Sequence, residues 1–245
     1  MDDPRSLKPL SNQPARRRGF PARLLDWFLP MHCVLCRREG WPTGLCDGCV
    51  SDLPRLGAAC RICASELPSP GVCGACLGRA PAFDETVAVF RYGAPVDRLI
   101  HALKYGHDLA VARALGHHMA TRSQCLSFDC MIPVPLHRRR LAERGFNQSI
   151  ELARETAHLH RRRIDAGCVR RVIETPPQAG LNLKERRRNL RHAFDVSGRL
   201  DGQRVLVIDD VMTSGATLDR LAQSLKQAGA ARVINLVCAR TPSGR

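Results

Sequence analysis

Two adjacent carboxylates, Asp209 and Asp210, precede a run of small residues that reads Thr-Ser-Gly-Ala-Thr at 213–217. Such a run places backbone amides and hydroxyl groups at the start of a helix, where hydrogen bonds and the helix dipole stabilise a phosphate dianion. Carboxylates do not suit a phosphate, but they accept hydrogen bonds from hydroxyl groups, such as the 2′ and 3′ groups of ribose. The pattern predicts a ribose 5-phosphate site made of Asp209, Asp210, Thr213, Ser214, Gly215, Ala216 and Thr217.

The surrounding pattern indicates the elements that position this site. Residues 205–208 form a continuous apolar run, which is typical of a parallel strand buried on both faces. Helical apolar spacing follows over 218–227, Gly229 ends that helix, and a second apolar run covers 233–238. Ligands bind parallel sheets at the carboxyl ends of the strands, which is where the acidic pair and the loop would lie. The alternative is an ordinary strand end with Thr217 as helix N-cap.

Eight of the twelve cysteines form four Cys-x-x-Cys pairs, and adding 27 to the number of each of the first four gives the second four. Two Cys-x-x-Cys turns supply the four thiolates of a tetrahedral zinc site, so the repeat predicts two structural zinc ions. Pairing along the chain is favoured because it closes the shorter loops, although a crossed arrangement satisfies the same repeat. The predicted ligands are Cys33, Cys36, Cys46, Cys49, Cys60, Cys63, Cys73 and Cys76.

Two other uses of these cysteines fit less well. Disulfides require an oxidising compartment, and the sequence shows no secretory signal. A thioredoxin-like redox role needs one Cys-x-x-Cys at a helix start rather than four evenly repeated pairs.

The composition describes a basic α/β protein. The 245 residues are 44% apolar with few aromatics, so the core must rest mainly on Leu, Val, Ile and Ala. Lys and Arg number 38 against 23 acids, a net charge of +15 that attracts phosphate-bearing partners or simply reflects a soluble surface. No run approaches the ~18 apolar residues of a membrane span. We therefore expect a cytoplasmic protein with no membrane partner, a flexible tail with a short amphipathic helix over 1–30, and folded domains after it.

Three further segments extend the pattern to a family resemblance. Residues 101–108, 131–149 and 178–194, taken with the paired cysteines, resemble the ComF family, the ComFC and GntX-like proteins associated with competence for DNA uptake. Residues 205–217 resemble the phosphoribosyl pyrophosphate (PRPP) fingerprint of type I phosphoribosyltransferases. The resemblance implies a phosphoribosyltransferase-like parallel sheet flanked by helices over 80–245, with a small N-terminal double zinc ribbon over 31–79. It also implies a basic hood over about 83–125 and a first sheet strand at 131–134.

The resemblance assigns further site residues. Asp209 and Asp210 become the catalytic pair, and Lys104 becomes a phosphate contact, unless its stem merely extends over a helix. Asn147 and Ser149 either cap a helix or touch the ligand. Pyrophosphate would be held by a basic loop over 135–146 and by a mobile loop within 178–194, or the latter charges form a solvated face or a nucleic-acid track. The named residues are Arg138, Lys184, Arg186, Arg187 and Asn189.

Two functions follow from these patterns. The first is binding of PRPP with Mg²⁺, linked to DNA uptake or DNA handling and extending to glycosyl transfer if the domain is catalytic. The alternative is a non-catalytic accessory protein that binds single-stranded DNA, because residues 131–191 hold 15 Lys or Arg against six acids. Phe146 is the sole aromatic residue of that segment, which opposes the alternative. The resemblance also implies competence or helicase-type proteins as partners, with the ribbon as a docking element or a structural support.

Overall fold

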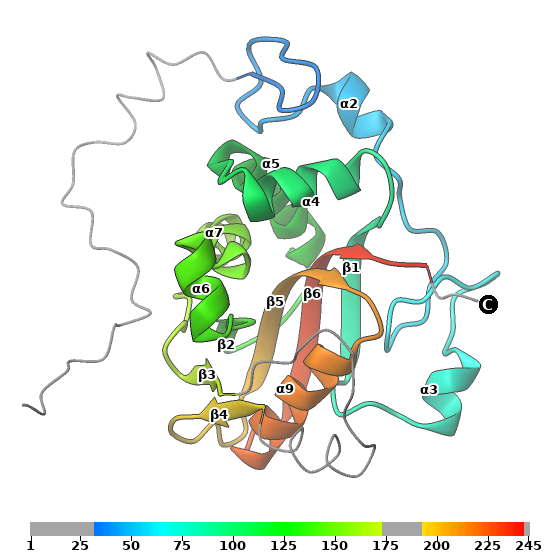
Figure 1. Cartoon of the computed structure of the whole chain (residues 1–245). Coiled ribbons are helices and arrows are strands. Elements are labelled where there is room, and N and C mark those ends of the chain that lie inside the picture. Colours follow the sequence, from blue (N-terminus) through cyan, green and yellow to red (C-terminus); the bar gives the residue numbers. More distant parts are fainter. Residues whose placement is uncertain (1–31, 173–192, 243–245) are drawn as a thin grey trace, which may run out of the picture.

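The computed structural model describes residues 32–172 and 193–242, which form an α/β chain (Figure 1). The helices are α2 (Asp47–Ser51), α3 (Gly74–Gly78), α4 (Val96–Tyr105), α5 (Leu109–Ser123), α6 (Arg138–Arg144), α7 (Gln148–Leu159) and α9 (Ala216–Gln227). The strands are β1 (Glu85–Arg91), β2 (Cys130–Pro133), β3 (Val169–Arg171), β4 (Phe194–Val196), β5 (Arg204–Met212) and β6 (Arg232–Arg240). The predicted tail and helix over 1–30, and the candidate residues Lys184, Arg186, Arg187 and Asn189, lie outside the described residues.

A four-stranded sheet in the order β1-β6-β5-β2 forms the centre, and its three strand pairs are all parallel. The two inner strands, β5 and β6, are buried along almost their whole length, as their continuous apolar sequences predict. The helix α9 connects them, so the predicted strand-helix-strand unit is confirmed. The parallel sheet with flanking helices is therefore the fold that the sequence predicts.

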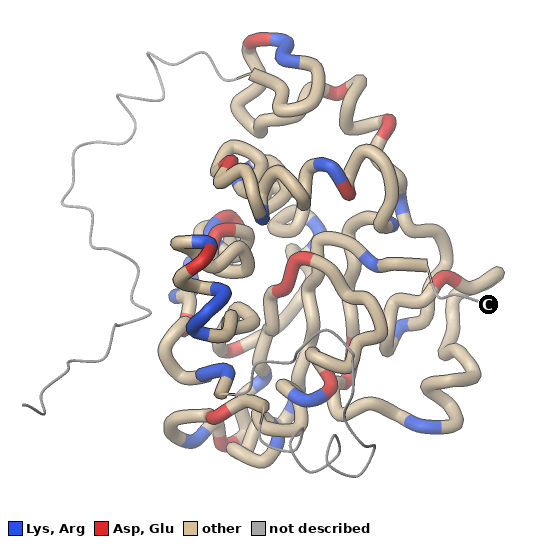
Figure 2. The backbone as a smooth tube through the Cα atoms, in the orientation of Figure 1, with Lys and Arg blue, Asp and Glu red and all other residues tan. Residues whose placement is uncertain are grey.

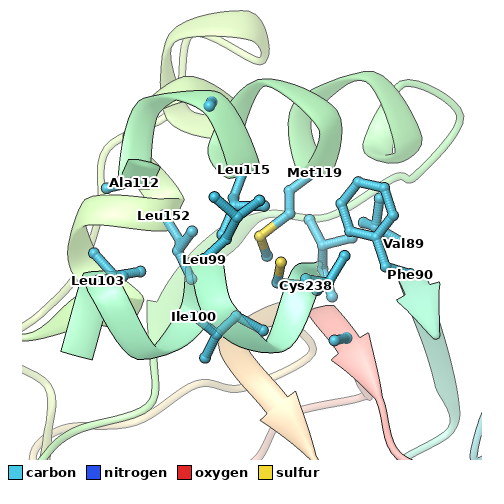
Figure 3. Packing of buried hydrophobic residues seen from close by; sticks show 14 of the residues in the cluster. Val89, Phe90, Leu99, Ile100, Leu103, Ala112, Leu115, Met119, Leu152 and Cys238 are labelled. Atoms are coloured by element: carbon cyan, nitrogen blue, oxygen red, sulfur yellow. The ribbon is translucent and has the colours of Figure 1, made fainter. Parts of the chain in front are cut away.

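The sheet separates two apolar cores. Side chains of α4, α5 and α7 cover one face, where Leu99, Leu115 and Leu152 pack together (Figure 3). Leu206 and Ile208 of β5 belong to the same core. The other face carries α9 and the short antiparallel pair of β3 with β4. Alternate residues of β5 contribute to the two cores because successive strand side chains point to opposite faces.

The predicted hood over 83–125 is wrong for its first part. Residues Glu85–Arg91 form β1, which pairs with β6 along the edge of the central sheet. The rest of the segment forms α4 and α5, whose buried faces pack in one core with the sheet. The strand over 131–134 is consequently not the first of the sheet.

The 27-residue repeat appears as two similar zinc modules, residues 32–52 and 59–79. Arg37 and Ala64 occupy equivalent positions, and both have positive φ, 63° and 54°. A short helix follows Cys46 in the first module and Cys73 in the second. The first module packs against α5 on the side away from the sheet, whereas the second packs beside Phe83 and α9 on the opposite face of the sheet. The two modules, although they share the repeated cysteine pattern, therefore pack against different parts of the protein.

Candidate functional site

The acidic pair lies within β5, not on the loop that follows it. Asp209 is 9% exposed and Asp210 is 4% exposed, and β5 continues for two more residues, to Met212. The strand continues because Val211 and Met212 still pair with β6. Figure 2 shows the two acids as a red segment near the carboxyl end of β5. That end of the sheet is where the sequence predicts a ligand site.

Each carboxylate is held by a side chain from a distant helix. Lys104 of α4 places Nζ 2.6 Å from Oδ2 of Asp210, and Ser149 Oγ of α7 donates to Oδ1 of Asp209 at 3.2 Å. The backbone amide of Asp210 also donates to Asp209 Oδ1 at 3.0 Å. Both acids are therefore fixed in orientation, and Asp210 has a counter-charge.

Burial raises the pKa of Asp209 to about 8, and the adjacent charge of Asp210 acts in the same direction. The charge of Lys104 and the hydrogen bond from Ser149 lower the pKa of Asp209, but by less. The raised pKa favours the protonated form of Asp209 over its anion. A ligand that stabilises the carboxylate anion of Asp209, by donating a hydroxyl hydrogen bond or by bringing a cation close, would favour loss of the proton.

Asn147 caps α7, as one of the two alternatives for it predicts. Its side chain accepts from the amide of Ser149 at 2.9 Å and donates to the carbonyl of Val134 at 3.0 Å. The second bond ties the helix start to the end of β2, so the cap also sets where Ser149 lies. The contact of Ser149 with Asp209 has no signal in the sequence other than a hydroxyl at a helix start.

Residues 213–217 form the connection into α9. Gly215, with φ +77°, occupies the N-cap position, and the helix begins at Ala216. Thr217 is thus inside the helix, and the alternative that made it the N-cap is wrong. Over the described ranges, no acceptor receives a hydrogen bond from the amides of Thr213, Ser214 and Gly215. Three consecutive free amides at a helix start form an anion-binding arrangement.

A cavity of about 840 Å³ opens beside this loop. The loop and the first turns of α9, including Asp219 and Arg220, form one wall. The second zinc module forms the opposite wall with Cys63, Cys76 and Arg79. The second module therefore borders the candidate phosphate loop.

The basic segment over 135–146 is a helix in its central part rather than a loop. His137 Nδ1 accepts from the amide of Arg139 at the start of α6, and Gly145 ends it with φ 72°. Arg138 is the first residue of α6 and is exposed. Arg144 lies over the ring of Tyr105 at 5.2 Å, and Figure 2 shows the basic residues of α6 in blue. The sequence signal for this helix was the glycine after it, since three consecutive arginines carry no apolar period.

The strands β3 and β4 bracket residues 173–192, which include most of the candidate mobile loop. Ser224 Oγ of α9 donates to the carbonyl of Phe194 at 3.2 Å, which fixes β4 against α9. Burial lowers the pKa of Arg171 of β3, the charge of Arg140 acts in the same direction, and the charge of Asp209 opposes them. The strand β4 is therefore attached to α9, and β3 is attached to it through its pairing with β4.

The eight paired cysteines form two separate clusters. Within each, all four Sγ atoms lie within 4.8 Å of one another. The separations Cys36–Cys46 and Cys63–Cys73 are both 3.6 Å, close to the ~3.8 Å between ligands of a tetrahedron with Zn–S of ~2.3 Å. The donor sets fit zinc, and the pairing follows the chain, as predicted. The clusters are Cys33, Cys36, Cys46 and Cys49, and then Cys60, Cys63, Cys73 and Cys76.

Comparison with known proteins gives two domain matches. A double zinc ribbon domain matches residues 24–77, and a phosphoribosyl transferase domain matches residues 170–245. These matches and the two cysteine clusters establish two Cys₄ zinc-binding sites. In the described residues, no helix combines the length and the apolar character that a membrane crossing requires.

Three curated proteins are similar over most of their length. The DNA utilization protein YhgH of Salmonella typhimurium is 34% identical over 84% of this chain and 95% of its own. Competence protein F of Haemophilus influenzae is 32% identical over 82% of this chain and 93% of its own. Competence protein ComFC of Bacillus subtilis is 25% identical over 78% of this chain and 81% of its own.

Proposed function

Because this chain belongs to the ComF family, together with the DNA utilization protein YhgH and competence protein F, we propose that it binds a phosphoribosyl ligand, PRPP, in the service of DNA handling. The observation that carries this proposal is the set of free amides at Thr213, Ser214 and Gly215, which directly follows a strand with two buried carboxylates. Amides suit a phosphate, and carboxylates suit ribose hydroxyls.

In this arrangement the 5′-phosphate lies on the amides and hydroxyls of residues 213–217. The ribose hydroxyls donate to Asp209 and Asp210, which requires Asp209 to give up its proton. Lys104 then balances the charge of two adjacent carboxylates, and its ammonium lies beside Asp210 for that purpose. The predicted role of Lys104 as a phosphate contact becomes a role at the ribose end of the ligand.

The pyrophosphate would meet positive charge from Arg138 and, outside the described residues, from Lys184, Arg186 and Arg187, with the neutral side chain of Asn189 as a hydrogen-bond donor. Mg²⁺ bound with PRPP would neutralise part of the pyrophosphate charge. The hydroxyl and carboxylate oxygens of this site are of the ligand type that such a hard cation prefers. The protein residues described above would hold the ribose and its 5′-phosphate.

Glycosyl transfer is the reaction that this arrangement supports. The bond from C1 to the pyrophosphate oxygen breaks, its electron pair leaves with pyrophosphate, and a nucleophile forms a new bond to C1. Asp209 and Asp210 would hold the ribose while C1 gains positive character.

The test is titration calorimetry of the zinc-loaded protein with PRPP and Mg²⁺. We expect saturable binding that falls at least about tenfold in Asp209→Asn. Asp129→Asn is the matched control, because Asp129 also borders β5 but lies at its amino end, paired with Arg204. Absence of saturable binding, or equal affinity in Asp209→Asn, would reject the site. Release of pyrophosphate on adding single-stranded DNA would separate a transferase from a binding protein.

A second candidate function, binding of single-stranded DNA, is favoured by one tertiary feature. Tyr105, 61% exposed, lies under Arg144, and the ring centroids of His107 and Phe146 lie 5.3 Å apart, so rings and an arginine from two segments meet on this surface. From the sequence of residues 131–191 alone, Phe146 was the sole candidate for stacking on a base. Exposed rings beside arginines provide surfaces on which bases stack.

This second candidate is tested by fluorescence anisotropy with a labelled oligo-dT at several salt concentrations. We expect affinity to fall as salt rises and to fall further in Tyr105→Ala. Leu109→Ala is the control, since Leu109 is similarly exposed but carries no ring. Affinity that is unchanged in Tyr105→Ala would remove the stacking role.

A further inference from the structure

Arg240, the last residue of β6, connects the second zinc module to the candidate phosphate loop. It is 6% exposed, and its guanidinium donates to acceptors of both elements. On the module side, Nε donates to the carbonyl of Cys63 at 2.9 Å and Nη2 donates to Ser65 Oγ at 3.0 Å. On the loop side, Nη1 donates to the carbonyls of Met212 at 3.2 Å and Thr213 at 2.5 Å.

These loop bonds set the direction of the free amides. In a trans peptide, the carbonyl and the following N–H point in opposite directions. Holding the Met212 carbonyl towards Arg240 therefore turns the amide of Thr213 away from it, and holding the Thr213 carbonyl does the same for the amide of Ser214. The amide of Thr241 also donates to the Met212 carbonyl, at 3.1 Å, which reinforces the first orientation. The Thr213 carbonyl receives only Arg240 among the described residues.

The module bonds depend on the metal site. Cys63 is a ligand of the second cluster, and its carbonyl lies in the turn from Cys60 to Ala64. That turn is held by the bond from the amide of Ala64 to the Cys60 carbonyl, at 2.7 Å, and Ala64 has positive φ. A metal that fixes the sulfurs of Cys60 and Cys63 fixes this turn, and with it an acceptor of Arg240. A buried guanidinium that loses an acceptor must move to find another.

The first module has no such connection. The positions equivalent to Cys63 and Ser65 are Cys36 and Arg38, and within the described residues neither has a hydrogen bond to the loop. The first module instead approaches α5, where a Cβ on Gly44 would lie 2.9 Å from the Cβ of Ala114. The duplication thus supplies an internal control.

We propose that Arg240 is a positioning residue through which zinc in the second module, but not in the first, sets the affinity of the loop for phosphate. This inference rests on the proposed function for its ligand, though not for its geometry. Arg240 acts by orienting the amides of Thr213 and Ser214.

The first experiment compares Arg240→Lys with the native chain, both loaded with two zinc ions. Lysine keeps the charge but donates from one point, so it cannot span both elements. We expect zinc content and circular dichroism to be retained and the affinity for PRPP with Mg²⁺ to fall at least about tenfold. Millimolar methylguanidinium should restore part of the affinity in Arg240→Ala. Native affinity in a folded Arg240→Lys would overturn the proposal.

The second experiment compares Cys60→Ser/Cys63→Ser with Cys33→Ser/Cys36→Ser, each of which removes one zinc site. We expect only the first variant to lose affinity and to shift the NMR amide resonances of Thr213 and Ser214. Equal effects, or shifts in neither variant, would overturn the coupling. If the native chain binds neither PRPP nor inorganic phosphate and the selective amide shifts still occur, the coupling stands and the proposed function fails.

Discussion

Lys104 on α4 places Nζ 2.6 Å from Oδ2 of Asp210 on β5, and this ion pair joins one helical layer to the carboxyl end of the sheet. The Lys104 side chain is 22% exposed and that of Asp210 is 6% exposed, so the pair is poorly solvated. Removing Lys104 would leave the charge of Asp210 with little access to water. The pair therefore contributes both to the stability of the fold and to the orientation of a candidate site carboxylate.

Lys104→Met should lower the free energy of unfolding by roughly 2–3 kcal/mol, because it leaves Asp210 buried without its counter-charge. Lys226→Met is the matched control, since Lys226 lies 2.8 Å from Asp84 in a pair that is 30% and 38% exposed. Exposed pairs contribute roughly 0–1 kcal/mol. Urea denaturation of the three proteins measures the difference. Equal losses in the two variants would show that burial of the Asp210 pair has no energetic consequence.

The stability of the chain should depend on pH through Asp209. An Asp with its ordinary pKa of 3.8 is ionised in the unfolded chain above that pH, whereas folded Asp209 keeps its proton up to about pH 8. The folded state thus binds more protons across this window, so stability falls as pH rises from about 4 to about 8. Asp209→Asn keeps an oxygen acceptor for Ser149 but does not titrate. Its stability relative to the native chain should rise from pH 5 to pH 8 in urea denaturation, and a constant difference would contradict the raised pKa.

The raised pKa of Asp209 also predicts how ligand binding depends on pH. If ribose hydroxyls donate to ionised Asp209, binding releases its proton, so the affinity for PRPP should rise between pH 6 and pH 8. Calorimetry in two buffers of different ionisation enthalpy would detect the released proton. Asp209→Asn should show neither the proton release nor the rise. Proton uptake by the native chain would exclude this role for Asp209.

Gly215→Ala should perturb the candidate phosphate loop more than a positive φ alone explains. A Cβ at Gly215 would lie 2.6 Å from Cε of Met212, whose side chain is buried. Gly198→Ala separates the two effects, because Gly198 has φ +90° and nothing within 4 Å of such a Cβ. We expect about 1 kcal/mol of lost stability for Gly198→Ala and a larger loss for Gly215→Ala, with weaker phosphate binding only in the latter. Thermal unfolding and calorimetry measure both, and equal losses would discount the Met212 contact.

Zinc content tests the pairing of the cysteines. Cys33→Ser/Cys46→Ser damages one cluster and should leave one zinc ion per chain. Cys33→Ser/Cys73→Ser, which replaces Cys46 by its repeat equivalent, damages both clusters and should leave none. A crossed pairing, with Cys33 and Cys73 in one site, would reverse the two results. Atomic emission after gel filtration provides the count.

Local patterns determined much of this protein. The Cys-x-x-Cys turns, the 27-residue repeat and the strand-helix-strand unit around the acidic pair depend on residues close together in the chain. Their geometry follows from short-range turns and from the burial of continuous apolar runs, so the sequence predicts both zinc ligands and sheet. The short helix α6 was missed because its arginines carry no apolar period, and only Gly145 marked its end.

Only the tertiary structure decided what surrounds the candidate site. Ser149 at Asp209, Lys104 at Asp210 and Arg240 between the second module and the loop are contacts between segments far apart in the chain. No local period encodes such contacts, because they depend on how whole elements pack over the two faces of the sheet. The burial that raises the pKa of Asp209 has the same origin, because the elements packed around the carboxyl group exclude water from it. The residues next to Asp209 in the sequence do not show that it is buried.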